Sequence, residues 1–235
     1  MTDKSRAPHI LMTRPREASE RFLAALRARR LAMGRAVISP AISIERLDAP
    51  VDLDGFEGVI VTSSNALAGV SAGPGLTAWC VGDTTAEAAA RAGFDAVSAG
   101  GTVDDLLHLV AEAKPRGPLL YLRGRHVSSD LAGRLSATDV NVVEYVVYDQ
   151  KACAPTNEAL ALLSGGETVI LPLFSPRAAR IVAEWAADAA APVTAVAMSD
   201  AVAEGWGGAA HVAARPTVEA MVSAVAELVT ETGNG

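Results

Sequence analysis

Short runs of Val, Ile and Leu alternate along the chain with Ala-rich amphipathic segments. The apolar runs predict strands at Ile10–Thr13, Ala36–Ile44, Gly58–Thr62, Ala78–Val81, Ala96–Ser98, Leu119–Arg123, Asn141–Tyr148, Thr168–Leu173, Val193–Ala197 and His211–Ala213. The amphipathic segments predict helices at Arg16–Arg30, Asn65–Ser71, Thr85–Ala92, Val103–Ala113, Ser128–Leu135, Pro176–Ala187 and Val218–Thr230. This alternation indicates an α/β fold with parallel sheets built from βαβ units.

The pattern also occurs twice, because segments of the first half recur in the same order in the second. The matches are Arg14-Pro15-Arg16 (then Ser19) with Arg123-Gly124-Arg125 (then Ser128), Ala36–Ile44 with Asn141–Tyr148, Val59–Ala66 with Val169–Ala178, Val81–Glu87 with Ala197–Glu204, and Thr102–Leu106 with Thr217–Met221. Each match is weak alone, but their common order indicates a duplication. The second strand of each half, Ala36–Ile44 and Asn141–Tyr148, is the longest, and we expect these two strands to link two lobes.

Composition limits the class of protein. A chain of 235 residues has room for two domains of roughly 100 residues each. Half of the residues are hydrophobic and only 4% are aromatic, which predicts a core rich in Ala, Val and Leu. No apolar run approaches the ~20 residues that span a bilayer, and the polar residues 1–8 lack the apolar core of a signal peptide. We therefore expect a cytoplasmic protein with no membrane partner.

The charge of the chain and its cysteines and histidines argue against nucleic-acid-binding and metal-binding proteins. A net charge of −7 argues against nucleic acid as a partner, and it would repel a polyanionic ligand except where local donors outweigh the global field. The two cysteines, Cys80 and Cys153, are far apart, and the four histidines form no pair with ligand spacing. We expect no metal, and we expect Cys80 to be a buried apolar residue.

Two arginines flank Pro15 at the start of the first predicted helix, where positive charge opposes the helix dipole. Arg14 and Arg16 either pair with Glu17 and Glu20 or bind an anion. The recurrence of the same feature at Arg123 and Arg125 slightly favours anion binding.

Hydroxyl groups gather where strands become helices. Thr62, Ser63 and Ser64 follow one strand, and Ser175 stands at the matching position of the second half. One residue of the first group is expected to cap its helix, which leaves the others free to contact a ligand. In the Val81–Glu87 segment, Thr84 and Glu87 fit a capping box, while Gly82 would permit a ligand to approach the backbone closely.

The fingerprints of several common enzyme classes are missing. The Val81–Glu87 segment lacks the Gly-Lys-Ser/Thr of a Walker A loop and lacks a full G-x-G-x-x-G, so nucleotide binding is disfavoured. No Ser/His/Asp set, Cys/His pair or G-x-S-x-G motif is evident. Tyr148, at the end of a predicted linker strand, is either a packed strand aromatic or a hydroxyl that faces a cleft.

The order of these segments resembles the uroporphyrinogen-III synthase family, and the resemblance covers nearly the whole chain. It rests on Thr13-Arg14-Pro15, Val59–Ala66, Val81–Ala86, Leu119–Gly124, Val146–Tyr148, Phe174–Pro176 and Arg215–Met221. It implies two similar Rossmann- or flavodoxin-like lobes with parallel sheets, joined by a two-stranded linker. Residues 1–35 plus 152–235 would form one lobe and residues 52–140 the other, with 36–51 and 141–151 as the linker strands.

The resemblance also implies a reaction. The family cyclises hydroxymethylbilane, with loss of water and inversion of the last pyrrole ring, in tetrapyrrole biosynthesis. It uses no cofactor, and we expect a monomer. The resemblance places Ser63, Ser64, Gly82, Thr84, Ser175 and Ser199 in the substrate cleft with Arg14 nearby, and it makes Tyr148 a general acid for departure of the hydroxyl. Thr62 joins the substrate-binding set as the first hydroxyl of its loop.

One segment departs from the family, and two rival functions stay open. The second-half loop, Met198–Ala203, keeps a hydroxyl only through Ser199, and Asp200 adds a negative charge there. The first rival is a non-catalytic ligand-binding or sensory module of the same fold. The second, an α/β enzyme for phosphorylated substrates, is disfavoured by the missing Walker and Rossmann fingerprints.

Overall fold

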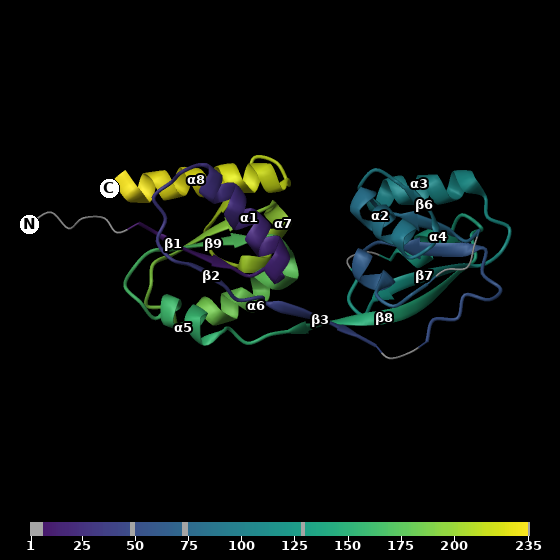
Figure 1. Cartoon of the computed structure of the whole chain (residues 1–235), viewed down its shortest axis with the longest axis horizontal. Helices are drawn as coiled ribbons and strands as arrows, with labels where there is room; N and C mark the ends of the chain where they lie inside the picture. Colours follow the sequence, from purple (N-terminus) through teal and green to yellow (C-terminus); the bar gives the residue numbers. More distant parts are fainter. Residues whose placement is uncertain (1–6, 48–49, 72–74, 128–129, 235) are drawn as a thin grey trace, which may run out of the picture. The chain divides into compact units, whose positions relative to one another are not determined.

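The computed structural model describes residues 7–47, 50–71, 75–127 and 130–234. It divides into two compact units, of which unit 1 comprises Met1–Ser43 and Ala152–Gly235 and unit 2 comprises Ile44–Lys151. Each unit has its own sheet, with helices on both sides (Figure 1). Among the described residues, no helix has the length and apolar character needed to cross a bilayer.

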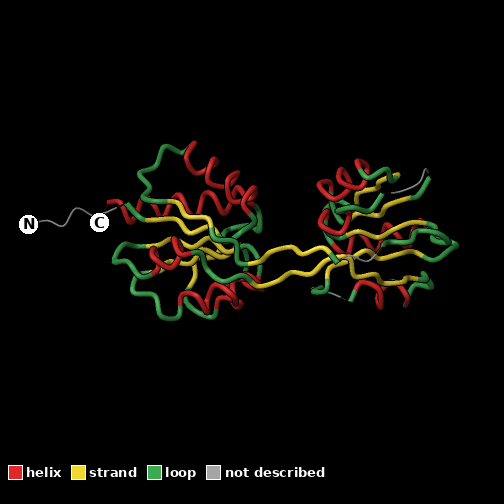
Figure 2. Tube along the Cα trace, turned by 60° about the horizontal axis from the view of Figure 1, so that its bottom comes forward, coloured by secondary structure: helices red, strands yellow, loops and turns green. Residues whose placement is uncertain are grey.

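Unit 1 is built on a five-stranded sheet with the order β11-β10-β9-β1-β2. Its strands are β1 (His9–Met12), β2 (Ala36–Ile38), β9 (Val169–Leu173), β10 (Val193–Ala197) and β11 (Ala210–Val212). All four pairings in this sheet are parallel, which confirms the predicted fold class. Figure 2 shows the strands of each unit side by side, with helices around them.

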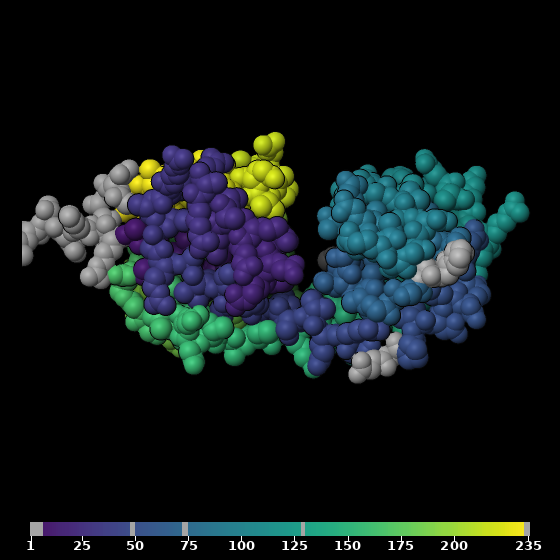
Figure 3. All heavy atoms as spheres, in the orientation of Figure 1, coloured from purple at the N-terminus to yellow at the C-terminus, as the bar shows by residue number. Residues whose placement is uncertain are grey.

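The sheet of unit 1 is covered on both faces. Ile10 and Met12 of β1 point to one face and Leu11 to the other, and none of the three has any exposed surface. The first face packs against α1 (Arg16–Ala28) and α8 (Val218–Asn234), which lie beside each other on the molecule (Figure 3). The second face packs against α5 (Asn157–Leu163), α6 (Pro176–Ala186) and α7 (Asp200–Trp206).

Unit 2 repeats this plan around a six-stranded sheet with the order β3-β8-β7-β4-β5-β6. Its strands are β3 (Ile42–Arg46), β4 (Gly58–Val61), β5 (Thr77–Cys80), β6 (Asp95–Ser98), β7 (Leu119–Gly124) and β8 (Val142–Ala152). The pairings that join β8, β7, β4, β5 and β6 are parallel. One face carries the 3₁₀ turn η1 (Ser64–Leu67) and α2 (Asp83–Arg91), and the other carries α3 (Val103–Ala113) and α4 (Leu131–Ser136).

The two sheets have equivalent strand orders. The order β11-β10-β9-β1-β2 in unit 1 corresponds to β6-β5-β4-β7-β8 in unit 2, strand by strand. Apart from the additional strand β3 of unit 2, each sheet therefore takes two strands from one half of the sequence repeat and three from the other. β3 and β8 carry the chain between the units.

The expected single strand Ala36–Ile44 is wrong, because the structure has two strands there, β2 and β3. The break falls at Pro40, which has no N–H group to donate. The neighbouring amides of Ser39 and Ala41 donate to Met12 and Thr13 at 2.8 and 2.9 Å, so the chain stays attached to β1 as it turns. Residues 36–38 are thus part of the sheet of unit 1 rather than of a linker strand.

Other element predictions need correction. The expected helix Asn65–Ser71 is the single 3₁₀ turn η1, and the pattern missed the short helices α5 and α7. The helix expected at Ser128–Leu135 is α4, which begins after Asp130, whose side chain accepts from the Gly133 amide at 3.0 Å. Ser128 itself, and with it that part of the repeat, lies outside the described residues.

Gly58 lies in a tightly packed part of unit 2, and its substitution tests this packing. A Cβ at this position would overlap the Thr77 carbonyl oxygen and lie 2.6 Å from the Trp79 ring. We expect Gly58→Ala to lower the free energy of unfolding by about 1–3 kcal/mol, as overpacking in a dense core does. Urea unfolding followed by circular dichroism measures the loss. Gly166→Ala, whose Cβ would meet nothing within 4 Å, is the control and should change stability by less than about 0.5 kcal/mol.

Cys80 has no exposed surface, which confirms its prediction as a buried residue. Burial raises the pKa of its thiol from 9.0 to about 11. The unfolded chain therefore loses this proton at a lower pH than the folded protein does. The part of the stability that depends on the protonated thiol is complete below pH 9 and is lost as the pH rises through 11. We expect Cys80→Ala to remove a fall on the order of 2–3 kcal/mol between these pH values. Urea unfolding across the range measures it, with Cys153→Ala as the control.

Candidate active site

The carboxyl ends of parallel strands meet at one edge of a sheet, and that is where open α/β sheets bind ligands. In unit 2 this edge carries Thr62 and Ser63 after β4, Gly82 after β5 and Gly124 at the end of β7. Tyr148 of β8 pairs with Gly124 there. Sequence-predicted site residues from three strands are therefore gathered at a single edge of unit 2.

A cavity of about 250 Å³ opens at this edge. It is lined by Thr62, Ser63, Val81, Val103, Tyr121, Gly124, His126, Val127, Tyr148 and Gln150. The cavity brings together three of the predicted residues, namely Thr62, Ser63 and Tyr148. Ser64, Gly82 and Thr84 are near it in sequence but are not part of its lining.

Tyr148 is both a packed strand aromatic and a residue at a cavity. Its side chain is only 5% exposed and packs in the core of unit 2, yet it also lines the cavity. A Cβ on Gly124 would lie 2.6 Å from the Tyr148 ring, so a glycine is needed at 124 for the ring to occupy this place. Among the described residues, none forms a hydrogen bond with the Tyr148 hydroxyl, which leaves that group available to a ligand.

The sequence analysis missed Tyr121. Its side chain is 3% exposed, and its hydroxyl lies 3.3 Å from Oγ1 of Thr62. Burial raises the pKa of Tyr121, against the hydrogen bond with Thr62 and the charge of Arg123, so the hydroxyl stays protonated at neutral pH. The available signal was a single polar aromatic in the otherwise aliphatic run Leu119–Leu122.

His126 was also missed, and it belongs to a charged cluster beside the cavity. Nε2 of His126 lies 3.6 Å from Asp149, which also pairs with Nε of Arg125 at 3.1 Å. Arg123 is paired as well, with Nε 2.7 Å from Glu144. Each basic side chain of this cluster therefore has a carboxylate close by. Within the described residues, no three His, Cys, Asp or Glu side chains are grouped to hold a metal ion.

Two of the predicted serines are helix caps. Ser63 precedes η1 and accepts from the Asn65 amide at 3.3 Å, and Ser175 precedes α6 and accepts from the Ala178 amide at 3.2 Å. Their O–H groups can still donate to a ligand, because capping uses only the oxygen. Ser64 is the first residue of η1 and is exposed.

The capping box predicted at Thr84 is wrong. Gly82 is the N-cap residue of α2, so Thr84 lies inside the first helical turn, where it is exposed, and no side chain caps the helix. Gly82 itself has an extended backbone with φ −159°, and a Cβ there would meet only Gly101, at 3.5 Å. The fold of unit 2 therefore does not require a glycine at 82, which is compatible with close approach of a ligand.

In unit 1 the equivalent edge carries Arg14 after β1, Ser175 after β9 and Ser199 after β10. Ser199 precedes α7, but its side chain makes no capping hydrogen bond. Arg16 lies 3.6 Å from Glu20, so pairing accounts for this arginine. Arg14 has no carboxylate partner among the described residues, and its guanidinium carbon lies 4.2 Å from the centre of the Phe174 ring. Pairing thus accounts for Arg16, whereas anion binding stays a prediction for Arg14.

Known proteins resemble this chain in sequence and in fold. The family model for HEM4, uroporphyrinogen-III synthase HemD, matches residues 20–223. The structure resembles uroporphyrinogen-III synthetase from Helicobacter pylori, with a TM-score of 0.66 and 18% identity over 94% of this chain and 99% of that one. It also resembles a mutant uroporphyrinogen III synthase from Thermus thermophilus, with a TM-score of 0.55 and 15% identity over 96% and 100% of the two chains.

A sequence comparison with curated proteins gave no match. The structural likeness, at under one-fifth identity, establishes the fold. The family model spans most of the 235 residues and both halves of the repeat. On that ground the chain belongs to the uroporphyrinogen-III synthase family.

Proposed function

We propose that this protein is a uroporphyrinogen-III synthase, which cyclises hydroxymethylbilane with loss of water and inversion of ring D. The family match over residues 20–223 carries this proposal. No observation favours the alternative of a non-catalytic binding module with the same fold. A phosphate-using enzyme is excluded by the family, which is a lyase of tetrapyrrole biosynthesis.

The task of such an enzyme is chiefly conformational. Hydroxymethylbilane closes by itself to the uninverted isomer, so the enzyme must hold the chain with the substituted carbon of ring D at the point of closure. Positioning of reacting atoms can contribute several kcal/mol to the choice between two products. This demand fits a site with hydroxyls and backbone amides at the strand ends rather than a nucleophile or metal.

We propose that the carboxylates of the substrate bind at the carboxyl edges of both sheets. In unit 2 the donors would be Thr62, Ser63 and Ser64, with Gly82 and Thr84 at the start of α2. The amides at that helix start are not used by a capping side chain, and they carry partial positive charge without adding net charge. In unit 1 the donors would be Arg14, Ser175 and Ser199.

We propose Tyr148 as the general acid for departure of the hydroxyl. Its support is the cavity, where its hydroxyl has no described hydrogen-bond partner and stands with Thr62 and the protonated Tyr121. A tyrosine can donate its proton as the C–O bond breaks and recover it from water afterwards.

Several properties of the protein stay predictions. We expect a cytoplasmic monomer that needs no cofactor and does not bind nucleic acid, the last because of the net charge of −7. Light scattering of the purified protein measures its oligomeric state, and with it whether one chain is sufficient for the site.

The reaction itself is tested with hydroxymethylbilane. The protein should convert it to the type III isomer faster than type I forms in buffer, and chromatography of the oxidised products separates the two isomers. Formation of type I alone, at the spontaneous rate, would sink the proposed activity and favour the binding module.

Tyr148→Phe tests the general acid. The variant keeps the ring that packs on Gly124, so we expect normal folding and a fall in kcat of roughly tenfold. Tyr145→Phe is a matched control in the same strand, since the Tyr145 hydroxyl donates to the Pro50 carbonyl at 3.0 Å and does not line the cavity. Unchanged turnover in Tyr148→Phe would remove this hydroxyl from the mechanism.

A further inference from the structure

Four arginines occupy the two matched positions of the repeat, and they differ in how their charge is compensated. Arg16 pairs with Glu20, Arg123 with Glu144 and Arg125 with Asp149. For Arg14, no carboxylate of the described residues lies within ion-pair distance. Arg14 is therefore the member of this set whose charge is not compensated by any carboxylate of the described residues.

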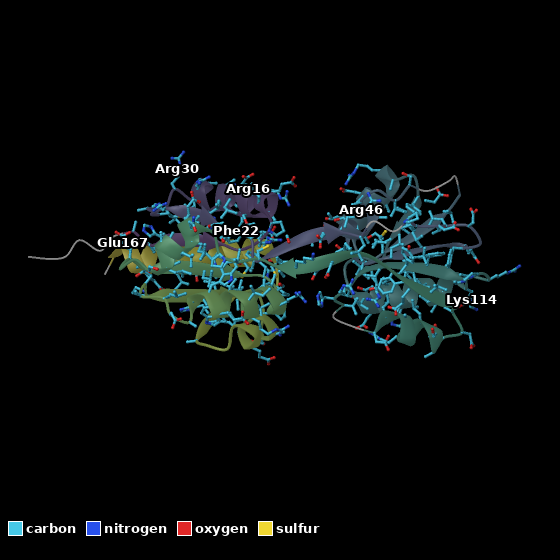
Figure 4. The ribbon with its side chains drawn as sticks, turned by 90° about the horizontal axis from the view of Figure 1, so that it is seen from below. Arg16, Phe22, Arg30, Arg46, Lys114 and Glu167 are labelled. Atoms are coloured by element: carbon cyan, nitrogen blue, oxygen red, sulfur yellow. The ribbon has the colours of Figure 1, made fainter. Side chains whose placement is uncertain are left out.

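Arg14 contacts Phe174, one ring of an aromatic pair with Phe22, instead of a carboxylate of the described residues. The guanidinium of Arg14 lies over the Phe174 ring at 4.2 Å, and Phe174 in turn meets Phe22 edge to face, with centroids 5.3 Å apart and planes at 86°. Phe22 is 1% exposed, and Figure 4 shows it among the packed side chains of unit 1 while Arg30 projects outward. Phe174 thus rests on a ring that cannot move freely.

The repeat offers an internal comparison. Arg14 corresponds to Arg123 in the repeat. Phe174 corresponds to Thr62, because Phe174 directly precedes the cap Ser175 and Thr62 directly precedes the cap Ser63. Two residues before each arginine, Met12 pairs with Ile38 and Tyr121 pairs with Glu144 across the neighbouring strand. Unit 2 thus has a glutamate for its arginine where unit 1 has an isoleucine. At the corresponding places unit 1 has Ile38 instead of the glutamate and Phe174 instead of Thr62.

We propose that Phe174 is a positioning residue, which holds the Arg14 guanidinium ready to bind a carboxylate of the substrate. This inference rests on the proposed function and adds to it the group that orients the unit 1 cation. A guanidinium that uses its face for a ring keeps the N–H groups on its edge for a carboxylate. A glutamate in place of the ring would occupy those N–H groups and cancel the charge, as it does for Arg123.

The environment of Arg14 agrees with this role. Burial, and after it the charge of Arg21, lower the pKa of Arg14, as expected for a cation without a carboxylate. The backbone is also fixed, because the Arg14 carbonyl accepts a hydrogen bond from the buried Ser19 hydroxyl at 2.9 Å. Both ends of the arginine are thus held before a ligand arrives, which reduces the entropy lost on binding.

The test compares Phe174→Leu with Phe174→Tyr, alone and in an Arg14→Gln background. We expect Phe174→Leu to raise KM for hydroxymethylbilane about three- to tenfold with a smaller change in kcat, and Phe174→Tyr to stay near wild type because it keeps the ring. With Arg14→Gln present, Phe174→Leu should add no further increase in KM. Val222→Ala, in the same core cluster, controls for loss of stability alone and should leave KM unchanged.

Binding without turnover separates this inference from the proposed function. Uroporphyrin III, which carries eight carboxylates, should bind more weakly to Phe174→Leu by a similar factor, whether or not the wild-type protein makes the type III isomer. An unchanged dissociation constant and KM in folded Phe174→Leu would overturn the inference. So would an equal effect of Phe174→Leu in the presence and absence of Arg14, since Phe174 would then act by itself.

A measurement on the wild-type protein covers the case in which Phe174→Leu does not fold. A proton over an aromatic ring is shifted upfield in the NMR spectrum, so the Nε–H signal of Arg14 should be displaced from the other arginine signals. Arg14→Gln assigns the signal by its disappearance. An unshifted signal would show that the guanidinium does not rest on the ring in solution, and the inference would fail.

Discussion

The central strands of both sheets are buried on both faces, and this burial constrains where chemistry can occur. Ile10, Leu11 and Met12 of β1 have no exposed surface, and neither do Val59, Ile60 and Val61 of β4. Helices cover each face, so a polar side chain along these strands would be cut off from water at a cost of several kcal/mol without a partner. Ligand-binding groups are therefore restricted to the strand ends, where side chains and helix amides from several strands meet.

Duplication of this plan gives the protein two such edges, which are equal in topology but not in charge. The strand orders correspond except for the additional strand β3 of unit 2, and both edges carry a serine cap in the same place. The matched arginines of the two edges have different neighbours, with Glu144 beside Arg123 and the Phe174 ring beneath Arg14. The edge of unit 2 also includes a cavity that Tyr121 and Tyr148 line. The two halves of the repeat thus offer different contacts to a ligand.

The fold followed from the sequence because its signals are local and repeated. Runs such as Val59–Val61 must be buried strands, and the internal repeat by itself indicates that the two sheets are equivalent. The errors occurred where a single backbone group decides the outcome, as at Pro40, which divides one apolar run into two strands, and at Gly82, which displaces the cap expected at Thr84. The candidate site residues in loops were predicted from their residue types, whereas Tyr121 was not, because in the sequence it resembles any other member of a hydrophobic strand. Its proximity to Thr62 depends on the pairing of β4 with β7, which no local pattern contains.

A protein with a net charge of −7 can bind a substrate with eight carboxylates only if the local field at the site opposes the global one. Additional arginines would not suffice, since Arg123 and Arg125 stand at a strand end and are each matched by an acidic neighbour. A local field of opposite sign instead needs an arginine without an adjacent carboxylate, as where unit 1 has Ile38 in the place of Glu144, together with donors that carry no net charge, such as hydroxyls and helix amides. The aromatic ring of Phe174 completes this arrangement, because it stabilises a cation without neutralising it. The charge of Arg14, which no carboxylate of the described residues compensates, therefore suits the edge of unit 1 to an anion more than the number of basic residues does.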